Sequence, residues 1–190
     1  MSNTWFTSDT HYFHGNIIKY CNRPFSNVEE MNEALITNYN SVVKPKDTIY
    51  HLGDFGFAHI DKIKYIASRL NGNKILLYGN HDKVIRNAPK GTFDSSFNFI
   101  RDYLEINVNG QKIILCHYPM LTWNASGRGS IMLHGHAHGK TNYGHIKNGK
   151  ILDVGVDVHN YFPISFDDVM KIMEKRVSED YGRARKNMDL

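Results

Sequence analysis

The sequence predicts an α/β protein in which a mixed sheet system is covered by helices. In the first half, apolar runs of strand length alternate with amphipathic stretches of helical period, which is typical of a parallel sheet with covering helices. In the second half, Asn109-Gly110 and Asn148-Gly149 each separate two apolar runs and so predict two β-hairpins. We therefore expect two sheets that pack face to face.

Three strands and two helices are expected in the first half. A capping box, Ser26-Asn27-Val28-Glu29, begins the first helix, and Pro45 follows its end. Asn71-Gly72 ends the second helix. The strands are expected at residues 3–7, 48–52 and 74–78, and the helices at residues 27–43 and 60–70.

The second half is expected to be rich in strands and to end in a helix. Ser165 is predicted to cap that helix, with Val169, Ile172 and Met173 on one face. The strands are expected at residues 103–108, 112–117, 130–133, 145–147 and 150–154.

The composition fits one globular domain over residues 1–177, followed by a basic tail at residues 178–190. The 190 residues are 41% hydrophobic and 22% charged, which is enough apolar material for a full core. No membrane span or secretion signal is predicted, and two cysteines are too few for a disulfide framework, so we expect a cytoplasmic protein.

The net charge of +4 suits an anionic substrate. The basic residues are scattered before the tail, which makes nucleic acid a weakly supported partner.

Acidic, imidazole and amide side chains follow five of the predicted strands. In open α/β sheets, ligands bind beyond the carboxyl ends of the strands, so these side chains can converge. Oxygen and imidazole donors suit manganese, iron, zinc or nickel, and the motifs lack the thiolates of a cysteine-type zinc site. The alternative is a set of internally satisfied histidines and turn residues, but five such motifs at strand ends favour a metal site. The motifs are Asp9-Thr10-His11, Gly53-Asp54, Gly79-Asn80-His81-Asp82, His117 and Gly135-His136-Ala137-His138.

This series of motifs, in this order over residues 9–138, resembles the calcineurin-like metallophosphoesterase superfamily. The flanking sequence resembles a small bacterial and phage branch, whose members are mostly described as predicted phosphoesterases. The resemblance implies a β-sandwich of two mixed sheets flanked by helices. The flanking segments are His14-Gly15-Asn16-Ile17-Ile18, Asn22-Arg23-Pro24-Phe25, Cys116-His117-Tyr118-Pro119-Met120 and Asp153-Val154-Gly155-Val156-Asp157.

The resemblance also implies two divalent cations that share one carboxylate. Manganese is the expected metal, with iron, zinc or nickel as alternatives. The first cation would be held by Asp9, His11, Asp54 and His138. The second would be held by Asp54, Asn80, His117 and His136, with Asp54 as the bridge.

A hydroxide that bridges the two cations would attack phosphorus. The resemblance makes His81 the histidine that faces the leaving group, where it stabilises charge and donates a proton. Asp82 would accept a hydrogen bond from His81 and orient its ring.

Substrate selection must come from residues outside these motifs. The candidates are His14, Asn16 and Arg23, which follow the first motif, and Arg128, which lies in the loop before the last one. Arg23 could clamp a second phosphate oxygen, and the alternative is a surface arginine with no such role. The alternative for Asn16 is an asparagine that caps a helix. Four aromatic residues near the motifs could stack a base or line the core: Tyr12, Phe13, Tyr118 and Trp123.

The expected function is therefore hydrolysis of a nucleotide-like or similarly small phosphodiester. The chain has no cap domain and no large insertion between motifs, so the site would be open to small esters. One alternative is a phosphomonoesterase, including a protein serine/threonine phosphatase. An alternative of another class is a non-catalytic metal-binding interaction module.

Overall fold

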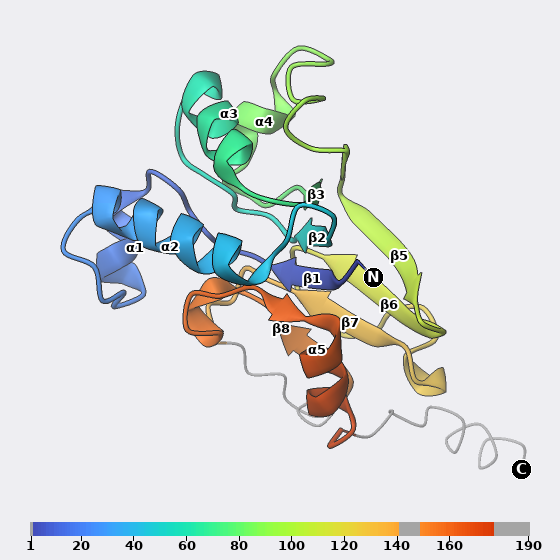
Figure 1. Cartoon of the computed structure of the whole chain (residues 1–190). Helices are drawn as coiled ribbons and strands as arrows, with labels where there is room; N and C mark the ends of the chain where they lie inside the picture. The colour runs from blue at the N-terminus through green and yellow to red at the C-terminus, as the bar shows by residue number, and fades with distance from the viewer. Residues whose placement is uncertain (1, 141–148, 177–190) are drawn as a thin grey trace, which may run out of the picture.

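The predicted pair of face-to-face sheets is present, with helices outside (Figure 1). The computed structural model describes residues 2–140 and 149–176. The first sheet has the order β4-β3-β2-β1-β9, and the second has the order β5-β6-β7-β8. The first sheet comprises β1 (Thr4–Thr7), β2 (Thr48–His51), β3 (Asn73–Leu77), β4 (Phe99–Arg101) and β9 (Ile164–Ser165). The second comprises β5 (Tyr103–Val108), β6 (Gln111–Cys116), β7 (Ile131–His134) and β8 (Ile151–Asp153).

Parallel pairing brings the carboxyl ends of the central strands to one edge of each sheet. Strands β1, β2, β3 and β4 run parallel, as do β6, β7 and β8. The edge strands β9 and β5 are antiparallel to their neighbours. The loops that follow β1, β2 and β3 therefore leave the first sheet together, beside those that follow β6 and β7.

Alternation along the strands builds two hydrophobic layers. In β3, Ile75 and Leu77 pack between the two sheets, whereas Leu76 packs against the helices on the outer face of the first sheet. Helices α2 and α3 supply the outer layer, and α5 packs on the layer between the sheets (Figure 1). The helices are α1 (Gly15–Tyr20), α2 (Val28–Val42), α3 (Ile60–Arg69), α4 (Lys83–Arg86) and α5 (Phe166–Met173).

The predicted elements match within a few residues, and the cap of α5 is confirmed, because Ser165 accepts the backbone N–H of Asp168. The cap of α2 is shifted by one residue. Asn27 accepts the N–H of Glu30 at 2.9 Å, and the Glu30 carboxylate accepts the N–H of Ser26 at 2.8 Å. The side chain of asparagine caps as well as that of serine, and it sits nearer to the first helical turn.

Six short elements of the described residues are not predicted: α1, α4, β4, β9 and the 3-10 helices Ser126–Arg128 and Val156–Val158. Each spans six residues or fewer, which is too short for a hydrophobic period to appear. The predicted strand at 145–147 and the tail at 178–190 lie outside the described residues. Within the described part of the chain, no helix combines the length and apolar character needed to cross a bilayer.

Candidate metal centre

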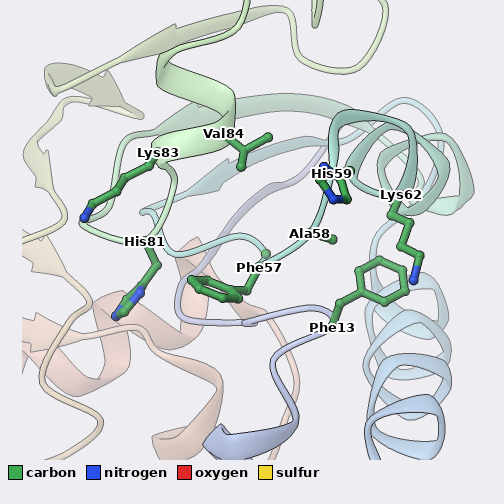
Figure 2. Close-up of a pocket in the computed structure, with 9 residues that line it drawn as sticks. Phe13, Phe57, Ala58, His59, Lys62, His81, Lys83 and Val84 are labelled. Carbon is green, nitrogen blue, oxygen red and sulfur yellow. The ribbon is translucent and has the colours of Figure 1, made fainter.

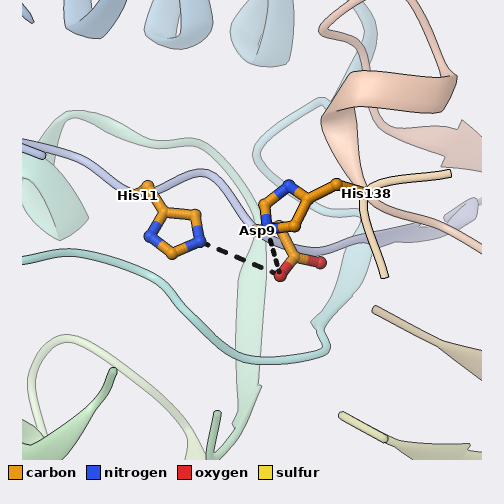
Figure 3. Close-up of side chains that lie close together, drawn as sticks. All are labelled: Asp9, His11 and His138. Atoms are coloured by element: carbon orange, nitrogen blue, oxygen red, sulfur yellow. Dashed lines mark ion pairs between the residues drawn. The ribbon is translucent and has the colours of Figure 1, made fainter. Parts of the chain in front are cut away.

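The loops after β1, β2, β3, β6 and β7 bring the seven predicted ligands together at one edge of the sandwich. Asp9, His11 and His138 form the first group (Figure 3). The Oδ1 atom of Asp9 lies 4.0 Å from Nε2 of His11 and 3.8 Å from Nε2 of His138. Two atoms that each bind one cation at about 2.1 Å lie about 3 to 4 Å apart, so this spacing leaves room for an ion among the three side chains.

Asp54 lies between this group and a second one. Its Oδ2 atom is 3.5 Å from Nε2 of His11 and 3.6 Å from Nε2 of His117. Asp9, Asp54 and His117 also place ligand atoms within 4.8 Å of one another. One carboxylate oxygen thus faces an imidazole nitrogen on each side, which is the arrangement that a shared ligand requires.

Asn80 completes the second group. Its Oδ1 atom lies 3.0 Å from Nε2 of His117 and 2.9 Å from Nδ1 of His136. The backbone N–H of His136 donates to both carboxylate oxygens of Asp9, at 3.1 and 2.9 Å, and so ties the loop after β7 to the loop after β1. The amide oxygen of Asn80 can bind a cation without adding negative charge to the site.

Two buried histidines have the protonation state that a metal ligand needs. Burial lowers the pKa of His11 and of His117, so both rings are neutral. The Nδ1 atom of His117 donates to the carbonyl oxygen of Leu52 at 2.8 Å, which leaves the lone pair on Nε2. Among the described residues, Nε2 of His11 has no hydrogen-bond partner, although it faces two carboxylates. A divalent cation would satisfy this atom, so the donor set fits the predicted metals.

Backbone conformation at the site is unusual. Five of the candidate ligands have positive φ angles in the left-handed region, which non-glycine residues seldom adopt and which costs about 1–3 kcal/mol per residue. Two glycines let the loops meet, because a Cβ atom at Gly79 would collide with Asp54, and one at Gly135 would collide with Ser8 and Asp9. The φ angles are 57° at Asp9, 51° at His11, 54° at Asp54, 68° at His136 and 48° at His138.

Arg23 is not the predicted phosphate clamp. Its side chain is buried, and its Nε and Nη2 atoms donate to the two oxygens of Asp157, each at 2.8 Å. Its remaining donors reach the carbonyl oxygens of Thr10, at 3.0 Å, and Asp9, at 2.7 Å, as well as the sulfur of Met31. No N–H group of the guanidinium is left for a substrate, so Arg23 instead fixes the loop that carries Asp9.

Asp157 is a positioning residue that the sequence did not single out. Its Oδ2 atom lies 2.7 Å from Nδ1 of His138, and this contact directs Nε2 of His138 toward Asp9. A carboxylate behind a ligand histidine fixes the ring, and Arg23 fixes the carboxylate in turn. The segment from Asp153 to Asp157 entered the family resemblance, but its spacing alone gave no signal of this contact.

Asp82 does not orient His81 as predicted. Its buried carboxylate accepts three backbone N–H groups, from Asp54 at 2.8 Å, Phe55 at 2.9 Å and Gly79 at 2.8 Å. Burial raises the pKa of Asp82 to about 6 against the effect of these hydrogen bonds. Asp82 therefore holds the loop that carries Asp54 against the loop that carries Asn80.

His81 and His14 lie beside the first ligand group. The backbone N–H of His81 donates to Oδ1 of Asp54 at 2.8 Å, and its ring centroid is 5.3 Å from that of His11. The Nδ1 atoms of His14 and His11 are 3.2 Å apart, and the ring of His14 stacks on Phe57 with centroids at 5.0 Å. Asn16 is exposed on α1.

Arg128 lies away from the centre and does not fit the predicted substrate contact. It belongs to the turn Ser126–Arg128, and Gln111 donates to the carbonyl oxygen of the next residue, Gly129, at 3.0 Å. Gln111 begins β6, whereas His117 follows its end, so Arg128 is at the opposite edge of the sheet.

Two of the four aromatic candidates are core residues. Tyr12 and Trp123 are buried, and the indole N–H of Trp123 donates to the carbonyl oxygen of Ser130. Phe13 lines a cavity beside His81, and Tyr118 is 47% exposed. The centroid of the Tyr118 ring lies 4.9 Å from the ring centroids of His117 and His136.

Protons compete with cations for the first ligand group. Burial raises the pKa of Asp9 to about 8, although His138 opposes the shift. Burial alone would lower the pKa of His138, but its contacts with Asp157, Cys21 and Asp9 outweigh burial and raise it to about 10. At neutral pH without an ion, both groups hold protons that a cation must displace.

Binding of Mn²⁺ is therefore expected to release about two protons per chain at pH 7, and its affinity should rise about 100-fold per pH unit from pH 6 to pH 7, with a smaller slope as the pH passes the pKa of Asp9. Lowering the pH protonates Asp9 and weakens binding. Calorimetric titration in two buffers of different ionisation enthalpy measures the release, with each buffer titrated alone as the control. Identical binding enthalpies in the two buffers would contradict the proton competition.

Comparison with known proteins agrees with the predicted fold. Residues 3–154 match the model of the calcineurin-like phosphoesterase superfamily domain. An uncharacterized protein of Methanocaldococcus jannaschii is 40% identical over 180 residues, which cover 92% of this chain and 93% of that protein. The gene 66 protein of Mycobacterium phage L5 is 28% identical over 208 residues, with coverages of 96% and 99%. The crystal structure of a protein of unknown function from Aquifex aeolicus has a TM-score of 0.70 at 28% identity, with 90% of this chain and 100% of that chain covered.

Proposed function

The chain belongs to the calcineurin-like phosphoesterase superfamily and is a metal-dependent phosphoesterase, and we propose that it uses two divalent cations to hydrolyse a small, nucleotide-like phosphodiester. The observation that carries the proposal is the position of Asp54. Its Oδ2 atom lies at nearly equal distances from His11 and His117, 3.5 and 3.6 Å, one in each ligand group.

We assign the first cation to Asp9, His11, Asp54 and His138, and the second to Asp54, Asn80, His117 and His136. When bound, two such cations supply an activated water and neutralise charge on the phosphoryl oxygens. Oxygen and imidazole donors accept several divalent ions, and we propose manganese, with iron, zinc and nickel as alternatives.

We assign the leaving-group side of the centre to His81. Its ring lies against that of His11 on one side and lines the adjacent cavity on the other. In the proposed reaction, His81 donates a proton to the alkoxide that leaves phosphorus. Asp82 supports this step indirectly, since it holds the Asp54 loop against the strand end that leads to His81.

Exposed rings on both sides of the centre favour a diester over a monoester. Phe57 is 56% exposed next to His81, and Tyr118 is 47% exposed next to His117 and His136. A diester carries an organic group on each side of phosphorus, and each ring can support one of them. A monoester would use one ring.

The two cysteines support a cytoplasmic location as part of the proposal. Cys21 and Cys116 are both free thiols, and reduced thiols are typical of the cytosol.

The proposal is tested by comparing hydrolysis of bis(p-nitrophenyl) phosphate and p-nitrophenyl phosphate after reconstitution with Mn²⁺, Fe²⁺, Zn²⁺ or Ni²⁺. We expect kcat/KM to be about tenfold or more higher for the diester, because the second aromatic group contributes about 1–3 kcal/mol of stacking. A higher value for the monoester would identify a phosphomonoesterase. Two bound cations without hydrolysis of either ester would identify a non-catalytic metal-binding module.

A further inference from the structure

A cavity of about 560 Å³ opens beside the metal centre, on the side of His81. Its walls are largely apolar and include the rings of Phe13 and Phe57, with Ala58 and Val84 nearby (Figure 2). This volume is within the range of about 300–1,000 Å³ that small-molecule sites occupy. Phe57 lies between His81 and Phe13 in the cavity wall, so a ring bound there would be adjacent to the reacting phosphorus (Figure 2).

The cavity is also cationic. Lys62 and Lys83 line it, and none of the aspartates and glutamates that the structure describes does. Among the residues that the structure describes, neither lysine forms an ion pair. The Nζ atom of Lys62 lies 5.2 Å from the centre of the Phe13 ring, while Lys83 stands on the His81 side (Figure 2). Two free ammonium groups beside exposed aromatic faces suit a ligand that is both aromatic and anionic.

The cavity is bordered by His81, the residue that the proposed function assigns to the leaving group. The centroid of the Phe57 ring is 6.0 Å from that of His81 and 5.0 Å from that of His14. If His81 protonates the leaving oxygen, the organic group attached to that oxygen must extend into the space that His81 borders. The cavity would then select the leaving group rather than the group that stays on phosphorus.

We propose that this cavity binds a nucleoside 5′-phosphate leaving group, whose base stacks on Phe57 and whose phosphate is bound by Lys83 on the His81 side. The inference rests on the proposed phosphodiesterase function and extends it. For the dinucleotide 5′-pApA, the oxygen of water bonds to the bridging phosphorus and the bond from phosphorus to the 3′-oxygen breaks. His81 gives that oxygen its proton and is reprotonated from the water that attacked, so one water yields two molecules of AMP.

The test compares kcat/KM for pApA and for ApA, which lacks the terminal 5′-phosphate, on the Mn²⁺-loaded protein. We expect pApA to be preferred about tenfold or more, and the double variant Lys62→Gln/Lys83→Gln to bring the ratio close to one. Phe57→Ala should lower kcat/KM for pApA about tenfold or more and weaken AMP binding, measured by calorimetry, about fivefold or more. Phe57 is exposed, so its removal leaves the core intact.

Two matched variants serve as controls. Lys64→Gln removes a positive charge from α3, the helix that carries Lys62, and Lys64 does not line the cavity. Phe99→Ala removes a ring that is 39% exposed elsewhere on the surface. Both variants should keep kcat/KM for pApA and the affinity for AMP within about twofold of the wild-type values, because surface substitutions away from a site have small effects.

The outcomes separate the inference from the function. Wild-type protein that hydrolyses bis(p-nitrophenyl) phosphate but treats pApA and ApA alike overturns the inference and leaves the function standing. Unchanged AMP binding in Phe57→Ala, or faster hydrolysis of a phosphoserine peptide than of pApA, also overturns it. Failure to hydrolyse bis(p-nitrophenyl) phosphate with any metal overturns the proposed function.

Discussion

Asp54→Asn is expected to empty both cation sites and to lower kcat/KM for bis(p-nitrophenyl) phosphate about 10³-fold or more. The buried carboxylate faces His11 and His117 through one oxygen and accepts the N–H of His81 through the other. Asparagine has nearly the same shape but lacks the negative charge that two cations would share. The metal content, measured by elemental analysis after dialysis, should fall from two ions per chain to fewer than one.

The control is Asp61→Asn, which removes an exposed acidic group from the first turn of α3 and should retain two ions and full activity. Thermal unfolding of both metal-free variants checks that the fold is kept. If Asp54→Asn retains two tightly bound ions, the carboxylate does not bridge them and the ligand assignment is wrong.

Much of the candidate centre could be predicted because its candidate ligands come from segments whose order is visible in the sequence. The strands that precede Asp9, Asp54 and Asn80 are short apolar runs, and parallel pairing brings their carboxyl ends to one edge. Residue type then narrows the chemistry, because carboxylate, imidazole and amide groups at adjacent strand ends have few uses other than binding cations.

The supporting contacts could not be predicted for two different reasons. Arg23 and Asp157 are 134 positions apart in the sequence, and the residues around each of them form no pattern that predicts the other as its partner. The partners of Asp82 are backbone N–H groups of Asp54, Phe55 and Gly79, which have no side-chain signature at all. Arg23 and Asp82 are charged and close to motifs in the sequence. That is why the sequence predicts substrate binding for Arg23 and orientation of the His81 ring for Asp82, and only their burial in the structure corrects both predictions.

The strained backbone of the candidate site could not be predicted from the sequence either. Motif spacing gives no indication that Asp9, Asp54 and His136 adopt left-handed conformations. These conformations persist because neighbouring loops hold them, as the hydrogen bond from the N–H of Asp9 to the carbonyl oxygen of Gly53 shows at 3.0 Å. The glycines that permit the close approach of these loops were visible in the sequence, but the loops they would contact were not.

His81→Ala is expected to keep both cations and to lower kcat for pApA about 10²- to 10⁴-fold, which is the usual contribution of a general acid. The ring of His81 belongs to neither ligand group, and the bond that ties this residue to Asp54 comes from its backbone N–H, which alanine retains. The loss for bis(p-nitrophenyl) phosphate should be much smaller, since p-nitrophenolate leaves without a proton. Metal content and kcat on both esters are the measurements.

The two substrates distinguish the two actions that a protonated imidazole can have at this position. Equal losses on both would show that His81 stabilises charge on the phosphoryl oxygens, which every ester shares, and would contradict proton donation. Loss of a cation would place the ring among the ligands instead. A selective loss on pApA would tie the ring to the oxygen that leaves, and hence to the cavity that His81 and Phe57 border.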